Sequence, residues 1–273
     1  MYNNPFNLNI WRQQGGVALL PLPNEPELAA IVAAMTPAPT SDRQGVMNQL
    51  IKDLKSAGVW SKLSVLYVHA AHAEQPGRVN WINPSSWTLN TVNAPTFTTD
   101  RGFAGDGSTS YLVTSFNLLS NTVGMLHTSS SVACGAWLNT TVSTPTGNLI
   151  GGSDVGVSAF RIRYITTTTA WVARVLTGVE IIGTVPVASR GLVSFGRLLD
   201  DHFVRSAGIN LVNQKVNSYS IYSNAELQIG RAGANYSSFQ LGLSYLGAWT
   251  SSTEENLFQS AANDYMITLG NTG

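Results

Sequence analysis

Hydrophobic residues recur every three or four positions between residues 40 and 57, and this spacing predicts an amphipathic helix. The apolar stripe consists of Val46, Leu50, Ile51, Leu54 and Ala57. Thr40 or Ser41 can cap the helix N-terminus, and Gly58 can end the helix in the left-handed conformation. We therefore expect this helix to turn one face toward a core.

Two shorter segments also have helical character. Residues 26–35 can form a helix with Asn24 as its N-cap. A second short helix can begin at Ser61 and would bury Leu63 and Leu66. The helix over residues 40–57 and the helix beginning at Ser61 together predict a small helical module over residues 40–77.

From about residue 78 onward the period of the pattern changes to two, which predicts short strands separated by turns. Such runs lie at residues 110–114, 132–138, 160–165, 170–175, 192–195, 227–229 and 240–246. One late helix is expected over residues 252–262, with Ser252 and Glu255 as a capping box. Many strands with few helices between them predict a mainly β protein with an antiparallel sandwich over residues 78–273.

The first 39 residues differ from both of these parts. Six of the 11 prolines lie within the first 40 residues, so this segment cannot be one continuous helix. We predict an extended arm whose apolar side chains lie on another surface, either on this chain or on a neighbouring subunit. The residues expected to anchor it are Phe6, Leu8, Ile10, Trp11, Leu19 and Leu20.

Composition and charge narrow the classes of function. Charged residues make up 11% of the chain, and 15 basic residues balance 15 acidic ones, so no basic field would attract nucleic acid. The single cysteine, Cys134, excludes an intramolecular disulfide and a cysteine-rich zinc site. No secretion signal is expected, because residues 1–16 lack a basic segment followed by an apolar one. No membrane-spanning segment is expected, because the longest apolar runs are far below about 20 residues.

Three segments resemble the laminin G-type sandwiches of the concanavalin A-like superfamily. They are GDGSTSYL at 105–112, LQIGR at 227–231, and FQLGLSYL at 239–246 followed by WTSSTEE at 249–255. The resemblance covers roughly residues 80–270. It implies an antiparallel jelly-roll sandwich of a superfamily that contains both lectins and glucanases.

A second resemblance covers about 70 contiguous residues at the join between the helical module and the sandwich. The order of motifs from Pro39 to Trp60, through the AAH segment at 70–72, to the NAPTFTTDRGF segment at 93–103 is similar to that of bacteriophage and prophage virion proteins. His69 and Ala73 depart from that pattern, which has an apolar and an acidic residue there. The resemblance implies a place on a virus particle rather than a chemistry.

Three groups of residues could form a catalytic or metal-binding site. Retaining glycosidases need two carboxylates about 5 Å apart, and the chain has no Glu-x-Asp-x-x-Glu strand that would supply them. His69 and His72 lack a third ligand with suitable spacing, and the Asp-Asp-His segment at 200–202 lacks a nucleophile. Asp106 is expected to stabilise a turn rather than to hold calcium. We therefore expect no enzyme, no metal and no cofactor.

Sugar binding requires exposed aromatic faces together with amide or hydroxyl groups. The residues that could supply them in loops are Tyr219, Tyr222, Asn224, Asn235 and Tyr236. Arg161, Arg163, Arg174 and Trp171 could instead line one face of a sheet, although Trp171 is expected in the core. These two surfaces remain alternatives.

The resemblances imply a virion structural protein, namely a tail-fibre, spike or tail component. It would be assembled in the cytoplasm of a host bacterium and would present the sandwich to host-surface polysaccharide. Its partners would be other virion proteins and copies of itself, with a trimer favoured because similar fibres are trimeric. The alternative is a capsid decoration or purely architectural virion protein that binds no glycan.

Overall fold

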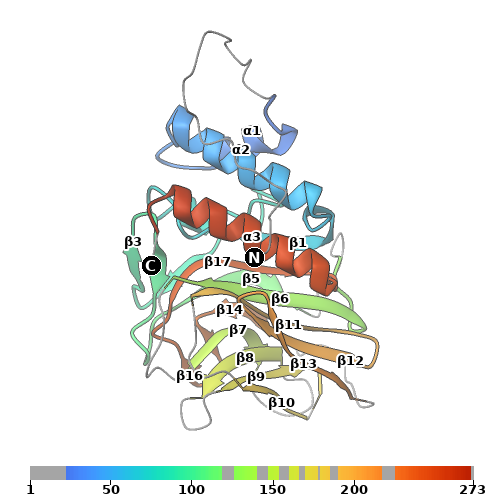
Figure 1. The fold of residues 1–273 in the computed structure, drawn as a ribbon. Helices are drawn as coiled ribbons and strands as arrows, with labels where there is room; N and C mark the ends of the chain where they lie inside the picture. The colour runs from blue at the N-terminus through green and yellow to red at the C-terminus, as the bar shows by residue number, and fades with distance from the viewer. Residues whose placement is uncertain are drawn as a thin grey trace.

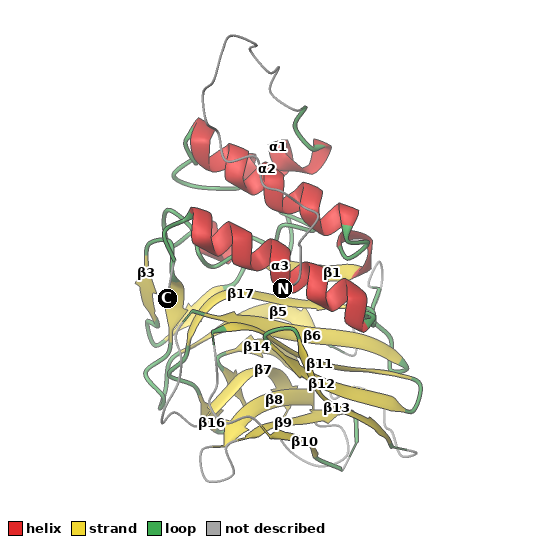
Figure 2. Ribbon diagram, viewed as in Figure 1, coloured by secondary structure: helices red, strands yellow, loops and turns green. Residues whose placement is uncertain are grey.

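The computed structural model describes residues 23–118, 126–139, 147–153, 160–165, 170–177, 179–184, 190–216 and 225–271. Two antiparallel sheets stack face to face, and a layer of helices covers the outer face of one of them (Figures 1 and 2). This arrangement confirms the predicted antiparallel β-sandwich. No helix in the described ranges is both long and apolar enough to cross a membrane.

The larger sheet has eight strands in the order β13-β12-β11-β6-β17-β4-β3, and β1 pairs with β17 beside this path. Its strands are β1 (Leu63–Tyr67), β3 (Thr96–Thr98), β4 (Gly102–Ala104), β6 (Ser131–Leu138), β11 (Gly191–Leu198), β12 (Asp201–Ser206), β13 (Ile209–Lys215) and β17 (Gln240–Gly247). Their apolar residues face the second sheet on one side and the helices on the other.

The smaller sheet has seven strands in the order β10-β9-β8-β7-β14-β5-β2. Its strands are β2 (Asn90–Val92), β5 (Tyr111–Asn117), β7 (Gly147–Ser153), β8 (Phe160–Ile165), β9 (Ala170–Val175), β10 (Ile181–Thr184) and β14 (Glu226–Ile229). A short hairpin of β15 (Arg231–Ala232) and β16 (Asn235–Tyr236) follows β14. The predicted strands at 160–165 and 170–175 are confirmed with the same bounds.

Two cores hold these layers together. The first lies between the sheets and contains Phe160, Trp171 and Phe195, each completely buried. The second lies between the eight-stranded sheet and the helices α1 (Pro26–Ala33), α2 (Ser41–Ser56) and α3 (Ser252–Thr268). In Figure 1, α3 lies on the sheet and α2 lies on the far side of α3. The helices therefore form a layer of the same body.

Thr40 caps α2 as predicted, because its side chain accepts a hydrogen bond from the Arg43 backbone N–H. Asn24 does not cap α1. The N-cap is Glu25, whose side chain makes no capping bond and whose backbone N–H instead donates to the side chain of Asn48 at 2.7 Å.

The prediction of a helix beginning at Ser61 is wrong. A 3₁₀ turn over Trp60–Lys62 leads directly into β1, which is buried along its whole length. Val65 enters the core between the sheets, whereas Leu66 enters the core under the helices. A strand with two apolar faces reads as a continuous hydrophobic run, which periodicity does not distinguish from a buried helix. Thus β1, within the range predicted as the helical module, pairs with β17 of the sandwich.

The late helix is longer than predicted, and its capping box lies one residue earlier. Ser251 and Glu254 form the box. The predicted partner Glu255 is buried and instead accepts hydrogen bonds from the hydroxyl groups of Tyr245 and Thr250. Two adjacent glutamates following two serines allow either register, and burial of Glu255 against the sheet decides between them.

Candidate functional site

The outer face of the seven-stranded sheet lies on the opposite side of the molecule from the helices (Figure 2). On β8, Phe160, Ile162 and Tyr164 point into the core, so the alternate residues Arg161 and Arg163 point outward. The outer face is therefore a sheet surface that carries polar and charged side chains, and two clusters gather on it.

The first cluster, which we call the aromatic cluster, consists of Tyr111, Arg231 and Tyr236. The guanidinium of Arg231 lies 4.6 Å from the ring centroid of Tyr111 and 4.9 Å from that of Tyr236. The two rings are 6.0 Å apart and meet at a steep angle. Cation–π contact with two rings fixes the guanidinium and orders both aromatic faces. All three side chains are half-buried, and the neighbouring Asn235 is exposed.

The hairpin that carries Arg231 and Tyr236 is held against β7. The buried side chain of Asn148 donates hydrogen bonds to the backbone oxygens of Ala232 and Asn235, at 3.1 and 3.2 Å. At Gly147, with φ of 148°, a Cβ atom would lie 2.3 Å from the backbone oxygen of Tyr236. Only glycine allows this close approach, so Gly147 and Asn148 together position the aromatic cluster.

The second cluster, which we call the arginine cluster, consists of Arg161, Arg163, Arg174 and Glu180. The Oε1 atom of Glu180 lies 3.1 Å from Nη2 of Arg161, 3.0 Å from Nη2 of Arg163 and 3.3 Å from Nε of Arg174. The Arg161 side chain is 4% exposed, whereas those of Arg163 and Arg174 are 27% and 23% exposed. Three positive charges thus meet at one carboxylate oxygen.

Strand register and a tight turn produce this convergence. Arg161 on β8 is directly opposite Arg174 on β9. Glu180 stands at the end of the turn between β9 and β10, where the Thr177 hydroxyl donates to the backbone oxygen of Val179 and accepts from its N–H, both at 2.9 Å. Burial lowers the pKa of Arg161, and the charges of Arg163 and Arg174 lower it further.

The residues predicted to bind sugar separate into two groups. Asn235 and Tyr236 lie on β16, and Tyr236 belongs to the aromatic cluster. Tyr219, Tyr222 and Asn224 lie outside the described residues. The predicted anchoring residues also lie outside them, namely Phe6, Leu8, Ile10, Trp11, Leu19 and Leu20.

The alternative set on the sheet face also separates. Trp171 is completely buried in the core, as expected, whereas the three arginines gather on the outer face. Prediction from the sequence missed Tyr111 and Arg231 as members of a site. Tyr111 could have been found from the alternation along β5, which turns its side chain to the face opposite that of the buried Leu112. The contact with Arg231 depends on the hairpin, which no local pattern specifies.

The Asp106 carboxylate makes its hydrogen bonds within its own turn. Oδ1 of Asp106 accepts hydrogen bonds from the backbone N–H groups of Ser108, Thr109 and Ser110, and Oδ2 accepts from the Thr109 hydroxyl. The backbone N–H of Ser110 and its neighbours hold the pKa of Asp106 well below its usual range. Asp106 therefore stabilises its own turn, as predicted. The described residues contain no group of three histidine, cysteine or acidic side chains placed to hold a metal.

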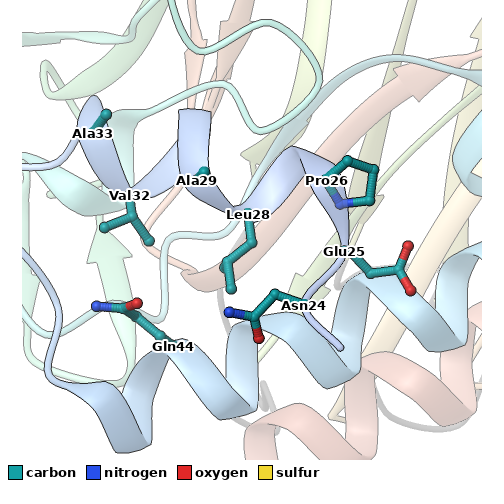
Figure 3. A pocket seen from close by; sticks show the side chains of 8 residues that line it. All are labelled: Asn24, Glu25, Pro26, Leu28, Ala29, Val32, Ala33 and Gln44. Atoms are coloured by element: carbon teal, nitrogen blue, oxygen red, sulfur yellow. The ribbon is translucent and has the colours of Figure 1, made fainter. Parts of the chain in front are cut away.

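A pocket of about 540 Å³ lies on the helical side of the molecule, between α1 and α2 (Figure 3). Its lining is mainly carbon atoms of Pro26, Leu28, Ala29, Val32 and Ala33. Glu25 also lines the pocket, but its carboxylate is ion-paired with Lys55 at 2.6 Å. Among the described residues of the lining, the one charged group is thus already paired within the chain.

Comparisons with known proteins bear on the fold. No family model and no curated protein matches the chain. The structure is similar to Trypanosoma rangeli sialidase in complex with sialic acid, with a TM-score of 0.51, 13% identity, and coverage of 79% of this chain and 38% of that chain. It is also similar to a structure of botulinum neurotoxin type C, whose cell entry depends on two ganglioside molecules, with a TM-score of 0.51, 11% identity, and coverage of 76% and 53%.

The chain thus spans about two fifths to one half of the length of these structures. At such low identity the likeness establishes the fold alone. The fold occurs both in sialidases, which are enzymes, and in a toxin that binds gangliosides.

The prediction that the chain is no enzyme is contradicted by these comparisons. It rested on the lack of the glucanase carboxylate pattern, of a third metal ligand beside His69 and His72, and of a nucleophile beside the Asp-Asp-His segment at 200–202. Proteins with the same fold as this chain include a sialidase captured as a covalent intermediate with 2,3-difluorosialic acid, with a TM-score of 0.50 and 12% identity. Because one fold can serve several chemistries, the missing glucanase motif does not exclude enzymes as a class.

Proposed function

We propose that the chain recognises glycans through the outer face of the seven-stranded sheet, with the aromatic cluster as the contact surface. The observation that carries this proposal is the cation–π contact of the Arg231 guanidinium with the rings of both Tyr111 and Tyr236. The comparisons support it, because one protein of this fold was solved with sialic acid and the cell entry of another depends on interaction with two ganglioside molecules.

The chemistry of the aromatic cluster suits a saccharide. Sugar rings present apolar C–H patches between their hydroxyl groups, and the two ordered tyrosine rings offer flat surfaces for those patches. Arg231 and the exposed Asn235 supply donors and acceptors for the hydroxyl groups. Because the hairpin is pinned to β7 by Asn148, the rings are ordered before the ligand arrives, which reduces the entropic cost of binding.

A glycan array probed with the purified chain tests this function, and Tyr236→Ala is the informative variant. We expect wild-type protein to bind a subset of bacterial-surface polysaccharides and the variant to lose about tenfold or more in affinity. Lys215→Ala is the matched control, because that side chain is 78% exposed on β13 of the other sheet. Silence of the wild-type protein across the array, or equal binding by Tyr236→Ala, would contradict the proposal.

We propose further that the chain is a virion component, a fibre, spike or tail protein of a bacteriophage, assembled in the host cytoplasm. The support is the resemblance of residues 39–103 to virion proteins. In this proposal the part of the predicted arm that precedes α1, residues 1–22, anchors the chain to other virion proteins and to copies of itself, in a trimer, because Leu28, Ile31 and Met35 of the rest are buried in this chain's own core. The sandwich is displayed toward the host surface. The alternative is a capsid decoration protein of the same particle that binds no glycan.

Labelled antibody and electron microscopy of particles test the virion role. Particles made with protein lacking residues 1–22 are expected to carry no label, while the truncated protein still binds the same glycans on the array. Label retained at the wild-type level would contradict the anchoring role. A decoration protein would leave host adsorption unchanged when it is missing, whereas a receptor-binding component would reduce it.

A further inference from the structure

We propose that the arginine cluster binds the carboxylate of an acidic saccharide. The inference rests on the proposed function, because it assigns a chemical class to the sugar that the outer face would recognise. The residues that would contact the carboxylate are Arg163 and Arg174, which are both about one quarter exposed beside the ion-paired Glu180.

The geometry of the three arginines is the first observation that supports carboxylate binding. Their guanidinium groups come from two neighbouring strands and converge on one oxygen, Oε1 of Glu180. The Nε atom of Arg163 makes no hydrogen bond within the described residues and is itself buried, so a ligand would meet the exposed part of this side chain, which is 27% exposed as a whole. Guanidinium groups bind carboxylates through paired N–H donors, so a site built from several of them has donors to offer to a second carboxylate.

The balance of charge between the arginines and Glu180 is the second observation that supports carboxylate binding. Among the residues that the structure describes, three positive charges of the cluster face the single negative charge of Glu180, and the Arg161 side chain is almost fully buried. Like charges placed directly opposite each other across a strand pair are destabilising, and Arg161 and Arg174 are such a pair. A second carboxylate would offset this repulsion, and a neutral ligand would not.

Apolar side chains beside the cluster favour a sugar over a simple inorganic anion. Val179 directly precedes Glu180 and is 43% exposed, and Ile182, two positions after Glu180, is 52% exposed. Ile182 pairs with Val172, which in turn pairs with Arg163 across the next strand. The carboxylate of a sugar acid would lie over the guanidinium groups while its C–H face lies against these aliphatic side chains.

The arginine cluster and the aromatic cluster belong to one surface. A Cβ atom on Gly151 of β7 would lie near the Cβ atoms of both Arg161 and Ala232, so the hairpin borders the arginine cluster. On its other side the hairpin reaches Tyr111 of β5 through Arg231. An oligosaccharide that crosses the hairpin could therefore place an acidic residue at one cluster and a neutral residue at the other.

The test compares D-glucuronate with D-glucose, which differ at the carboxylate, by NMR titration of the full chain while the arginine Nε–H signals are followed. We expect glucuronate to shift the signals of Arg163 and Arg174 in a saturable way and glucose to leave them unchanged. Arg163→Gln should weaken glucuronate binding about tenfold or more, whereas Lys215→Gln should leave it unchanged. The amide spectrum of each variant verifies that it is folded.

Equal responses to the two sugars in the wild-type protein would overturn the inference, and this comparison needs no variant. An unchanged glucuronate affinity in folded Arg163→Gln would overturn it as well. Its failure is distinguishable from that of the proposed function. Array binding that is lost in Tyr236→Ala but shows no preference for acidic glycans over their carboxyl-reduced forms would leave glycan recognition standing without an acid-specific subsite.

Discussion

Arg161 and Arg174 face each other across β8 and β9, and both contact the same oxygen of Glu180. We predict that Glu180→Gln lowers the free energy of unfolding by about 1–2 kcal/mol. This value lies between those for buried and exposed ion pairs, because Glu180 is about one quarter exposed. Urea denaturation followed by circular dichroism measures the change.

Glu226→Gln is the control for this substitution, because Glu226 is an exposed residue at the start of β14 in the same sheet. It should leave the free energy of unfolding within about 0.5 kcal/mol of the wild-type value. Equal effects of the two substitutions would show that Glu180 does not offset repulsion among the arginines.

Gly147 controls the position of the hairpin, so we predict that Gly147→Ala is destabilising and also weakens glycan binding. The new Cβ would lie 2.3 Å from the backbone oxygen of Tyr236, and backbone must move to relieve this contact. The expected loss is about 2–3 kcal/mol of stability, together with a lower affinity on the array.

Gly45→Ala is the matched control. Gly45 lies within α2, and apart from the neighbouring backbone of the helix itself no atom would come within 4 Å of its Cβ. Alanine should stabilise this helix by about 0.5–1 kcal/mol, because it restricts the unfolded chain and favours helical backbone. If Gly147→Ala instead behaved like Gly45→Ala, the hairpin would not be fixed by its approach to β7.

Three buried histidines predict that stability falls as the pH is lowered from about 6.5 to 4. Burial lowers the pKa of His69, His127 and His202 to about 4. The unfolded chain binds protons near its ordinary pKa of about 6.5, so between these two values it holds more protons than the folded chain. Each histidine then contributes a slope of about 1.4 kcal/mol per pH unit.

His69 offers the sharpest test of this pH dependence. Its Nδ1 lies 2.8 Å from the Gly77 carbonyl oxygen, so Nδ1 carries the proton and Nε2 accepts from the Ser244 hydroxyl. Urea midpoints at pH 7.5 and pH 5.0 should differ less in His69→Gln than in the wild type. An unchanged difference would show that His69 is not neutral in the folded protein at pH 5.0.

The sequence predicted the sandwich because its strands follow local rules. At 160–165, aromatic and β-branched residues alternate with arginines, so period and composition give the same answer. The run at 170–175 is apolar except for Arg174 and is rich in β-branched and aromatic residues. The pattern failed at β1, which lies between two cores and is apolar on both faces. The aromatic cluster was half predictable, because Tyr236 follows a turn signal. Its partner Tyr111 is contributed by a strand 125 positions earlier, through a packing that no local pattern encodes.

Substitution of one buried residue of α1 tests whether the helical layer and the sandwich unfold together. Ile31 is completely buried in the core beneath the helices, a core that also contains Trp137 of β6 and Phe258 of α3. We predict that Ile31→Ala costs about 2–5 kcal/mol and shifts the whole unfolding transition, because a shared core couples the layers. The control is Ile267→Ala, whose side chain is 46% exposed on α3 and which should change little. A separate early transition of the helices, with the sheet signal unmoved, would show instead that α1 and α2 fold as an independent module.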